Sequence, residues 1–390
     1  MAQEEELPYP TVKSVLSIQS HVVHGYVGNR TSTFPLQVLG WDADVLNTVQ
    51  LSNHTGYGKI FGQKLSAEEI WTQYEGLRNI GMHLEYDAVL TGYVPTADGT
   101  RTVGKIAADI VKSQEKEKEE KTQGGNGEKK KSQAIWILDP VIGDNGRYYV
   151  EQDVIPVYRE ILRNGGVTAV TPNQFEAEVL TGITIKTRGD VIRVLDVFHR
   201  EYRVPHVILT SMKLDAEADT IWSVGSSLES CGVEGSVEVP HVFYYEYPSL
   251  KAYITGTGDL FAALLVDRLH KYLELARGDA NGFAKVIAGA AEAAEAEAEA
   301  EAEAEAEAEA EGEPGKEDAR YIPLAFALGE VLGVVQAVIR RTLANPALKT
   351  VQAGVYGNIE SMKNGELKLI QSRDLIPGTA IPYQVRKFEV

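Results

Sequence analysis

Apolar runs of strand length alternate with segments of helical periodicity along most of this chain, and this alternation constrains the fold more than any other feature. Strands that alternate with helices form a mostly parallel sheet with helices on its faces. The predicted strands of this series are 15–20, 43–49, 88–92, 134–139, 167–171 and 206–210. Two later runs, 221–224 and 237–245, have no helix between them and predict a small antiparallel edge. We therefore expect residues 1–390 to form a single α/β domain.

Two segments interrupt this pattern and are predicted to be insertions outside the core. Residues 113–133 are charged and contain glycine, which predicts a surface loop, and residues 290–318 are dominated by a Glu-Ala repeat. Glu and Ala both favour helix, but glutamate at every second position leaves no apolar stripe and places like charges four residues apart. We expect an exposed helix or a disordered loop, with an acidic interaction tail as the alternative.

Charge and cysteine content exclude several classes of protein. The formal net charge is −18, and ten of the negative charges lie in residues 292–311, which leaves −8 for the remainder. A nucleic-acid surface needs clustered Lys and Arg, and no run approaches the roughly 20 apolar residues of a membrane helix. The single cysteine, Cys231, cannot form an internal disulfide, and the first residues are acidic. We expect a cytoplasmic protein without a nucleic-acid or membrane partner.

The segment Thr255-Gly-Thr-Gly-Asp-Leu-Phe261 carries the clearest chemical signal. Gly256 and Gly258 allow backbone N–H groups to converge, and the helix expected after them directs its positive end at the same place. Thr257 lies between the glycines, and Asp259 at the helix start can accept the proton of an attacking hydroxyl. A glycine turn with a capping aspartate is the simpler interpretation. The Walker A pattern does not occur in the sequence.

Polar residues also follow other predicted strands, where the carboxyl ends of a parallel sheet form a crevice. Asn173 and Glu176 open a helix after the strand that ends near Thr171, and they can hold a hydrated Mg²⁺ or form a capping box. Asp139 and Asp144 follow another strand. A third strand ends with Thr210 and Ser211. Together these groups predict a phosphate and cation site at one edge of the sheet.

Several motifs resemble the pyridoxal kinase family of the ribokinase-like superfamily. They are Ser17-Ile-Gln-Ser-His-Val22, Gly25-Tyr-Val-Gly-Asn-Arg30, Ser52-Asn-His-Thr-Gly-Tyr57, Leu90-Thr-Gly-Tyr93 and Gly256-Thr-Gly-Asp-Leu-Phe261. The resemblance covers most of residues 13–275. It implies a ribokinase-like fold, a homodimer, and ATP-dependent phosphorylation of the 5′-hydroxymethyl group of pyridoxal, pyridoxine or pyridoxamine in vitamin B6 salvage.

The resemblance also implies roles for individual positions. Asp259 would be the general base, and Gly256, Thr257 and Gly258 would form the anion hole. The B6 vitamer would contact Ser20, Val27, His54, Thr55, Tyr93 and Asp259. ATP would lie near Asp139, Asn173, Glu176, Thr210, Ser211, Leu250, Lys251, Ala252 and Thr257. Mg²⁺ or another divalent ion would be served by Asp144 and Glu176, and a monovalent cation such as K⁺ by Asp139, Thr171 and Thr210. Either Tyr148 or Tyr149 would help to cover the phosphates.

Two other functions remain compatible with these residues. A hydroxymethylpyrimidine kinase would share the phosphate site and differ at Ser20, Thr55 and Tyr93. A protein that binds pyridoxal 5′-phosphate without catalysis would keep the fold, although it would not need Asp259 as a base.

Overall fold

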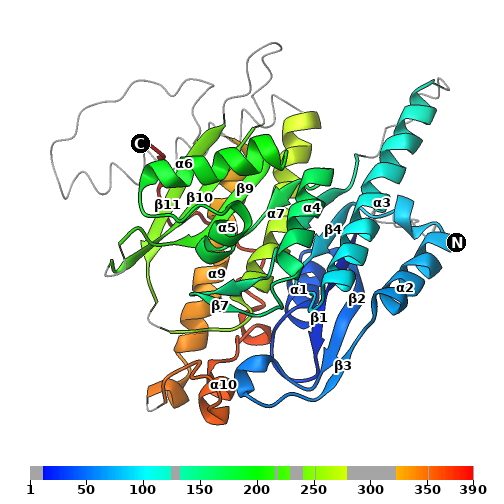
Figure 1. Cartoon of the computed structure of the whole chain (residues 1–390). Coiled ribbons are helices and arrows are strands. Elements are labelled where there is room, and N and C mark those ends of the chain that lie inside the picture. Colours follow the sequence, from blue (N-terminus) through cyan, green and yellow to red (C-terminus); the bar gives the residue numbers. More distant parts are fainter. Residues whose placement is uncertain are drawn as a thin grey trace, which may run out of the picture.

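A computed structural model describes residues 12–123, 132–215, 218–228, 240–250, 252–278, 322–349 and 351–389. Its centre is a ten-stranded sheet in the order β12-β11-β10-β9-β8-β5-β4-β1-β2-β3 (Figure 1). The six strands from β9 to β2 in this order are parallel, and β10, β11, β12 and β3 are antiparallel. The predicted α/β class, with a mostly parallel sheet and an antiparallel edge, is confirmed.

Eight strands of the main sheet correspond to predicted apolar runs and differ from them mainly in length, whereas the three-residue strands β3 and β12 and the separate β6–β7 hairpin were not predicted. The main sheet contains β1 (Lys13–Val22), β2 (Trp41–Leu51), β3 (Gly62–Lys64), β4 (Ala88–Thr91), β5 (Ile135–Leu138), β8 (Ala169–Val170), β9 (His206–Met212), β10 (Thr220–Ser227), β11 (His241–Pro248) and β12 (Val385–Lys387). A separate hairpin is formed by β6 (Gly143–Asp144) and β7 (Arg147–Tyr148). The central strands β4 and β5 are buried throughout, as their uninterrupted apolar sequences require.

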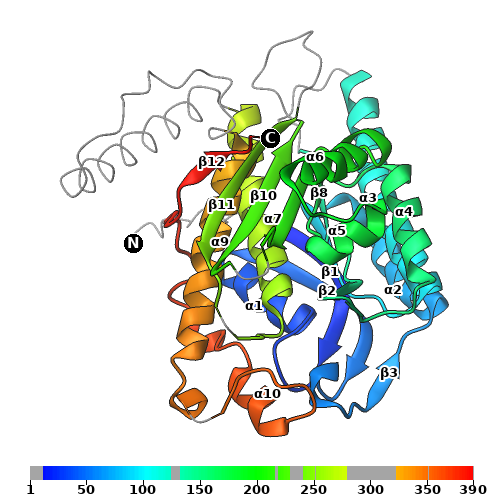
Figure 2. The ribbon, with the colours of Figure 1, turned by 60° about the vertical axis from the view of Figure 1, so that its left-hand side comes forward.

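Helices cover both faces of the sheet. One face carries α1 (Asn29–Val38), α7 (Thr257–Gly278) and α9 (Pro323–Leu343), and α7 packs on both of the other two. The other face carries α2 (Ala67–Asn79), α3 (Ala97–Gln123), α4 (Val154–Asn164), α5 (Gln174–Thr181) and α6 (Arg188–Asp196). Figure 2 shows the two helical layers on opposite sides of the strands. The layers enclose two apolar cores, one on each face of the sheet.

The sequence is expected to contain no run that approaches a membrane helix, but among the described helices α9 is long and apolar enough to cross a membrane by length and composition. Most of its residues are buried against α7 and the sheet. Its apolar sequence accounts for this burial.

One sequence prediction is wrong in part. Residues 113–133 were predicted to be a loop, but α3 continues through Gln123, so the first half of this segment is helical. Its glutamates and lysines are good helix formers. Residues 124–131 and the predicted insertion 290–318 lie outside the described part of the chain.

The last described residues return to the sheet and to the loops near its carboxyl edge. Helix α10 (Ile359–Gly365) packs beside the short 3₁₀ helix Thr55–Tyr57 that follows β2 (Figure 1). The backbone N–H of Gly357 donates to the carbonyl oxygen of Gly56 at 2.8 Å. Strand β12 then extends the sheet beyond β11. The C-terminal segment therefore contacts the turn after β2, near one edge of the sheet, and adds a strand at the opposite edge.

Candidate active site

The glycine-containing loop before α7 is held in its conformation by close contact with another loop. Gly256 has φ +87°, and a Cβ atom there would lie 1.9 Å from the carbonyl oxygen of Tyr26. Helix α7 begins at Thr257 and carries Asp259 in its first turn. The first backbone N–H groups of a helix have no partner within it and attract anions. The geometry is therefore that of an anion cradle with a carboxylate at its rim.

Asp259 is held by the loop that follows β1. The backbone N–H of Gly28 hydrogen-bonds the Asp259 carboxylate, and the Ser32 hydroxyl donates to the Asp259 carbonyl oxygen at 3.2 Å. Gly28 has φ +54°, and a Cβ atom there would come within 2.3 Å of the Ser20 hydroxyl. Burial raises the pKa of Asp259, and the Gly28 hydrogen bond offsets part of that rise. A carboxylate with a raised pKa is a stronger proton acceptor than one in water.

A cluster of carboxyl groups lies next to the cradle. Asp139 follows β5, is buried, and accepts a hydrogen bond from the Thr171 hydroxyl at 3.3 Å. One of its oxygens would be 3.9 Å from a Cβ atom at Gly258. Burial, with repulsion from Glu176 and Asp259, raises the pKa of Asp139. The sequence-predicted residues of β5, β8 and α7 are thus brought together at the carboxyl edge of the sheet.

Glu176 fixes the loop that follows β5. Its carboxylate accepts from the backbone N–H groups of Ile142 at 2.9 Å, Gly143 at 3.3 Å and Asn173 at 3.0 Å. Asn173 caps α5 and completes a capping box with Glu176, so the simpler of the two predicted roles is present. Burial raises the pKa of Glu176 to about 8 even though the three N–H groups oppose the shift. Asp144, on the hairpin, is partly exposed, and burial also raises its pKa.

The two candidate tyrosines on the hairpin face different surroundings. The Tyr149 hydroxyl lies 2.9 Å from the Tyr253 hydroxyl, and its carbonyl oxygen accepts from the Tyr93 hydroxyl at 3.4 Å. Tyr148 instead packs edge-on against Phe175, 5.1 Å between ring centroids. Burial raises the pKa of Tyr93. Tyr149 therefore connects the hairpin to the predicted vitamer pocket and to the loop before Gly256.

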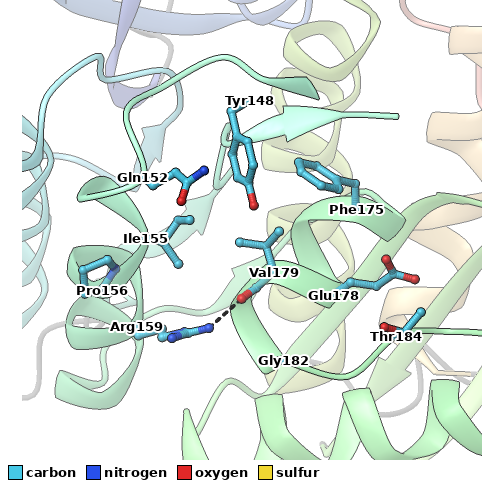
Figure 3. Close-up of a pocket in the computed structure, with 10 residues that line it drawn as sticks. All are labelled: Tyr148, Gln152, Ile155, Pro156, Arg159, Phe175, Glu178, Val179, Gly182 and Thr184. Carbon is cyan, nitrogen blue, oxygen red and sulfur yellow. Dashed lines mark hydrogen bonds between the residues drawn. The ribbon is translucent and has the colours of Figure 1, made fainter. Parts of the chain in front are cut away.

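Tyr148 lines a separate pocket of about 460 Å³ between α4 and α5 (Figure 3). In this view the ring of Tyr148 points toward Val179 and stands beside Phe175. The Arg159 guanidinium at its floor donates to the carbonyl oxygens of Val179 and Leu180. This pocket includes neither Asp259 nor the Gly256–Gly258 loop.

The remaining predicted residues take the following positions. Ser20 and His54 are buried, Val27 and Tyr93 are partly buried, and Thr55 is exposed. On the nucleotide side, Thr210, Leu250, Ala252 and Thr257 are partly buried and Ser211 is exposed. Lys251 lies outside the described residues. The Thr210 carbonyl oxygen already accepts from the hydroxyls of Ser223 at 2.5 Å and Tyr247 at 3.2 Å.

One buried residue of the site was not predicted. Glu366 follows α10, and its carboxylate contacts His54, Tyr57 and the backbone N–H of Tyr26. The contacts with His54 and Tyr26 span 312 and 340 positions of sequence. The acidic residue Glu366 within Asn364-Gly-Glu-Leu367 gives no local sign of this role, because only the fold brings it to the loops after β1 and β2.

Comparison with known proteins agrees with this geometry. Pyridoxal kinases of Homo sapiens and Sus scrofa are 40% and 41% identical over 66% of this chain, covering 78% and 75% of their own lengths. The chain belongs to the pyridoxal kinase family. A Saccharomyces cerevisiae relative, BUD17, is 34% identical over 95% of both chains. Residues 126–284 match the family model described as phosphomethylpyrimidine kinase.

A solved structure extends the similarity to the whole fold. The pyridoxal kinase of Leishmania donovani in complex with ADP and ginkgotoxin has a TM-score of 0.70 and 29% identity. The match covers 97% of this chain and 100% of the other. The family and fold inferred from the motifs are therefore confirmed.

Proposed function

We propose that this protein phosphorylates the 5′-hydroxymethyl group of pyridoxal, pyridoxine and pyridoxamine with ATP. The observation that carries the proposal is Asp259, which stands at the first turn of α7 beside the Gly256 loop and receives the Gly28 N–H. Pyridoxal kinases from mammals are relatives of this chain, and the Leishmania donovani enzyme was solved with ADP and with pyridoxamine.

The geometry supplies the parts of a phosphoryl transfer. The acceptor oxygen forms a bond to the γ-phosphorus as its proton passes to the Asp259 carboxylate, and the bond from phosphorus to the β,γ-bridging oxygen breaks to release ADP. The backbone N–H groups at the start of α7 stabilise the charge on the transferred group. Ser20, His54, Thr55 and Tyr93 orient the acceptor, with Val27 beside them. Asn173, Ser211 and Thr257 contact the phosphates, and Leu250 and Ala252 lie by the nucleotide.

We also propose two cation sites at the acidic cluster. Asp139 and Glu176 are buried, and the carboxylates of Glu176 and Asp259 repel that of Asp139. Such a carboxylate fits a site that a cation neutralises. No group of three or more His, Cys, Asp or Glu side chains forms a metal site within the described ranges, so a divalent ion would rely on phosphate oxygens for the rest of its shell. Mg²⁺ would be held by Asp144 and Glu176, and K⁺ by Asp139, Thr171 and Thr210. Bound there, the divalent ion would neutralise charge on the phosphates.

The substrate assignment is tested by comparing acceptors. ADP formation is measured with pyridoxal, pyridoxine, pyridoxamine or hydroxymethylpyrimidine as the sole acceptor. We expect turnover with the B6 vitamers and a lower kcat/KM with the pyrimidine. Preference for the pyrimidine would favour the hydroxymethylpyrimidine kinase, whose family model matches residues 126–284. Binding of pyridoxal 5′-phosphate without ATP consumption would identify a non-catalytic binding protein.

We further propose a homodimer in the cytoplasm. The dimer is proposed by analogy with the family, and the cytoplasm because the sequence contains a single cysteine.

A further inference from the structure

Glu366 is a buried carboxylate shared by two loops of the substrate side. Its Oε1 atom lies 3.1 Å from His54 Nε2 and 2.8 Å from the Tyr57 hydroxyl, and its Oε2 atom lies 3.0 Å from the Tyr26 backbone nitrogen. Gly25 allows this approach, since a Cβ atom there would come within 2.6 Å of Oε1. Every one of these partners donates to the carboxylate, as the burial of a charged group requires.

The hydrogen bonds fix the tautomer of His54. The backbone N–H of Gly56 donates to His54 Nδ1 at 3.2 Å, so Nδ1 carries no proton. The proton of the neutral ring is therefore on Nε2, which donates to Glu366. Because both ring nitrogens are used within the protein, His54 has no nitrogen left to bond a vitamer, and its buried ring packs against Tyr57 with 4.7 Å between ring centroids. A carboxylate that receives the second N–H of a histidine also sets the orientation of the ring.

The same carboxylate reaches the loop that supports the general base. Tyr26 donates its N–H to Glu366, and its carbonyl oxygen lies directly against Gly256. Two residues later, the Gly28 N–H contacts Asp259. The residue after Glu366, Leu367, would be 3.4 Å from a Cβ atom at Gly256. One residue of the C-terminal segment is thus linked to the vitamer loops and to the anion cradle.

The pKa of Glu366 indicates that its side chain is ionised at neutral pH. Burial raises the pKa of Glu366, but the hydrogen bonds from His54, Tyr57 and Tyr26 more than offset this and leave the pKa below its usual value. The side chain is therefore a carboxylate at neutral pH and can accept from all three donors at once.

We propose that Glu366 is a positioning residue for the phosphoryl acceptor: it fixes the tautomer and orientation of His54 and aligns the loops 25–28 and 54–57 on the pocket. This inference rests on the proposed function, because the acceptor is the B6 vitamer. Glu366 acts through His54 and the two loops, and it makes no contact with the reacting atoms.

The test is Glu366→Gln, which keeps the shape but replaces one acceptor oxygen by an amide donor. The amide must then face either the Tyr26 N–H or the pair of donors from His54 and Tyr57, so at least one hydrogen bond is lost. We expect KM for pyridoxal to rise on the order of tenfold, while KM for ATP changes less than about twofold because no nucleotide-side residue contacts Glu366. A melting temperature close to that of the wild type would exclude general unfolding.

Asp374→Asn is the matched control. Asp374 is an exposed carboxylate of the same C-terminal segment and pairs with Arg341 away from the loops. Loss of the Asp374 charge should leave KM for pyridoxal unchanged. Equal effects of the two variants, or equal rises of KM for both substrates in Glu366→Gln, would overturn the proposal.

The tautomer gives a readout that does not depend on activity. In the protein labelled with ¹⁵N-histidine, we expect His54 to show a protonated Nε2 and an unprotonated Nδ1, with its signals identified by their absence in His54→Gln. In Glu366→Leu, which removes both carboxylate oxygens, Nε2 loses its acceptor and only the Gly56 N–H then favours this tautomer, so we expect a mixture of tautomers. An unchanged His54 spectrum would overturn the positioning role, even if activity falls. A wild-type protein that is inactive toward pyridoxal would overturn the proposed function. The spectrum would then test only the hydrogen bond between His54 and Glu366.

Discussion

Asp259 is the residue on which the proposed chemistry depends most directly. We expect Asp259→Asn to lower kcat on the order of 10²-fold or more, because the amide cannot accept a proton. The amide oxygen can still accept the Gly28 N–H, so pyridoxal and ATP should bind nearly as they do to the wild type. Steady-state kinetics and calorimetric titration measure the two effects. A variant with near wild-type kcat would show that another group is the base.

Glu176 predicts a pH dependence of stability. Its folded pKa of about 8 exceeds the value of about 4.3 for an unfolded chain, so the folded state binds this proton more tightly. Protonated Glu176 therefore contributes its full stabilisation at pH values below the unfolded-state pKa, and this stabilisation is lost as the pH rises through the folded-state pKa. In the ligand-free protein, the unfolding free energy should fall more between pH 5 and pH 8 in the wild type than in Glu176→Gln. Urea unfolding at several pH values measures this, and parallel curves would contradict it.

At the scale of residues, sequence predicts the site where a motif and its function are local. Asp259, Gly256 and Gly258 lie in one short segment, and the capping box of Asn173 and Glu176 spans one helical turn, so both could be identified before the fold was known. Glu366 could not be identified in this way, because the groups that donate hydrogen bonds to its carboxylate lie more than 300 positions away in the sequence. Nor does sequence distinguish Tyr148 from Tyr149, because they are adjacent residues of the same type and only the fold places Tyr148 on Phe175 and Tyr149 on Tyr253.

At the scale of elements, the period of the apolar residues predicted the sheet and its covering helices. The central strands were predictable because they are buried on both faces and read as continuous apolar runs. Several short or polar elements were not predicted, and two of them show why. The end of α3 is rich in Glu and Lys, which favour helix by propensity and form no apolar stripe. The three-residue strand β12 pairs with the edge of β11.

The β6–β7 hairpin is the element whose role is easiest to test. We expect Tyr149→Ala to lower kcat/KM for pyridoxal about tenfold, because it removes the contact with the Tyr253 hydroxyl that holds the hairpin beside the site. Tyr148→Ala is the matched control, since Tyr148 packs on Phe175 in the pocket of Figure 3. Its kcat/KM should stay within about twofold of the wild type. The reverse ranking would show that Tyr148 faces the substrates.

At the scale of the whole molecule, the negative charge at the site predicts a dependence on cations. ATP brings further negative charge to a cradle of backbone N–H groups beside Asp139, Asp144 and Glu176. We expect the rate to depend on a divalent ion and to rise with K⁺ at fixed Mg²⁺ and ionic strength, with tetramethylammonium as the replacement ion. A flat response to K⁺ would remove the monovalent site, and full activity in excess EDTA would remove the divalent one.

The oligomeric state is a separate prediction for the whole molecule. We expect light scattering to give the mass of a dimer at micromolar concentration, by analogy with the family. A monomer under these conditions would contradict the homodimer, and it would leave the kinase assignment unaffected because the described site is built from one chain.

The return of the C-terminal segment to the substrate side has a consequence for biosynthesis. The chain leaves the ribosome from its N-terminus, so the loops 25–28 and 54–57 are made long before Glu366, and its contact with Tyr26 spans 340 positions. The sheet and most of its helices can collapse during translation, whereas the vitamer loops obtain their buried carboxylate only when the residues around Glu366 emerge. A product that terminates early would keep Asp259 and the glycine loop, yet lack the residue that aligns the acceptor. Complete synthesis is therefore a condition for an ordered pocket.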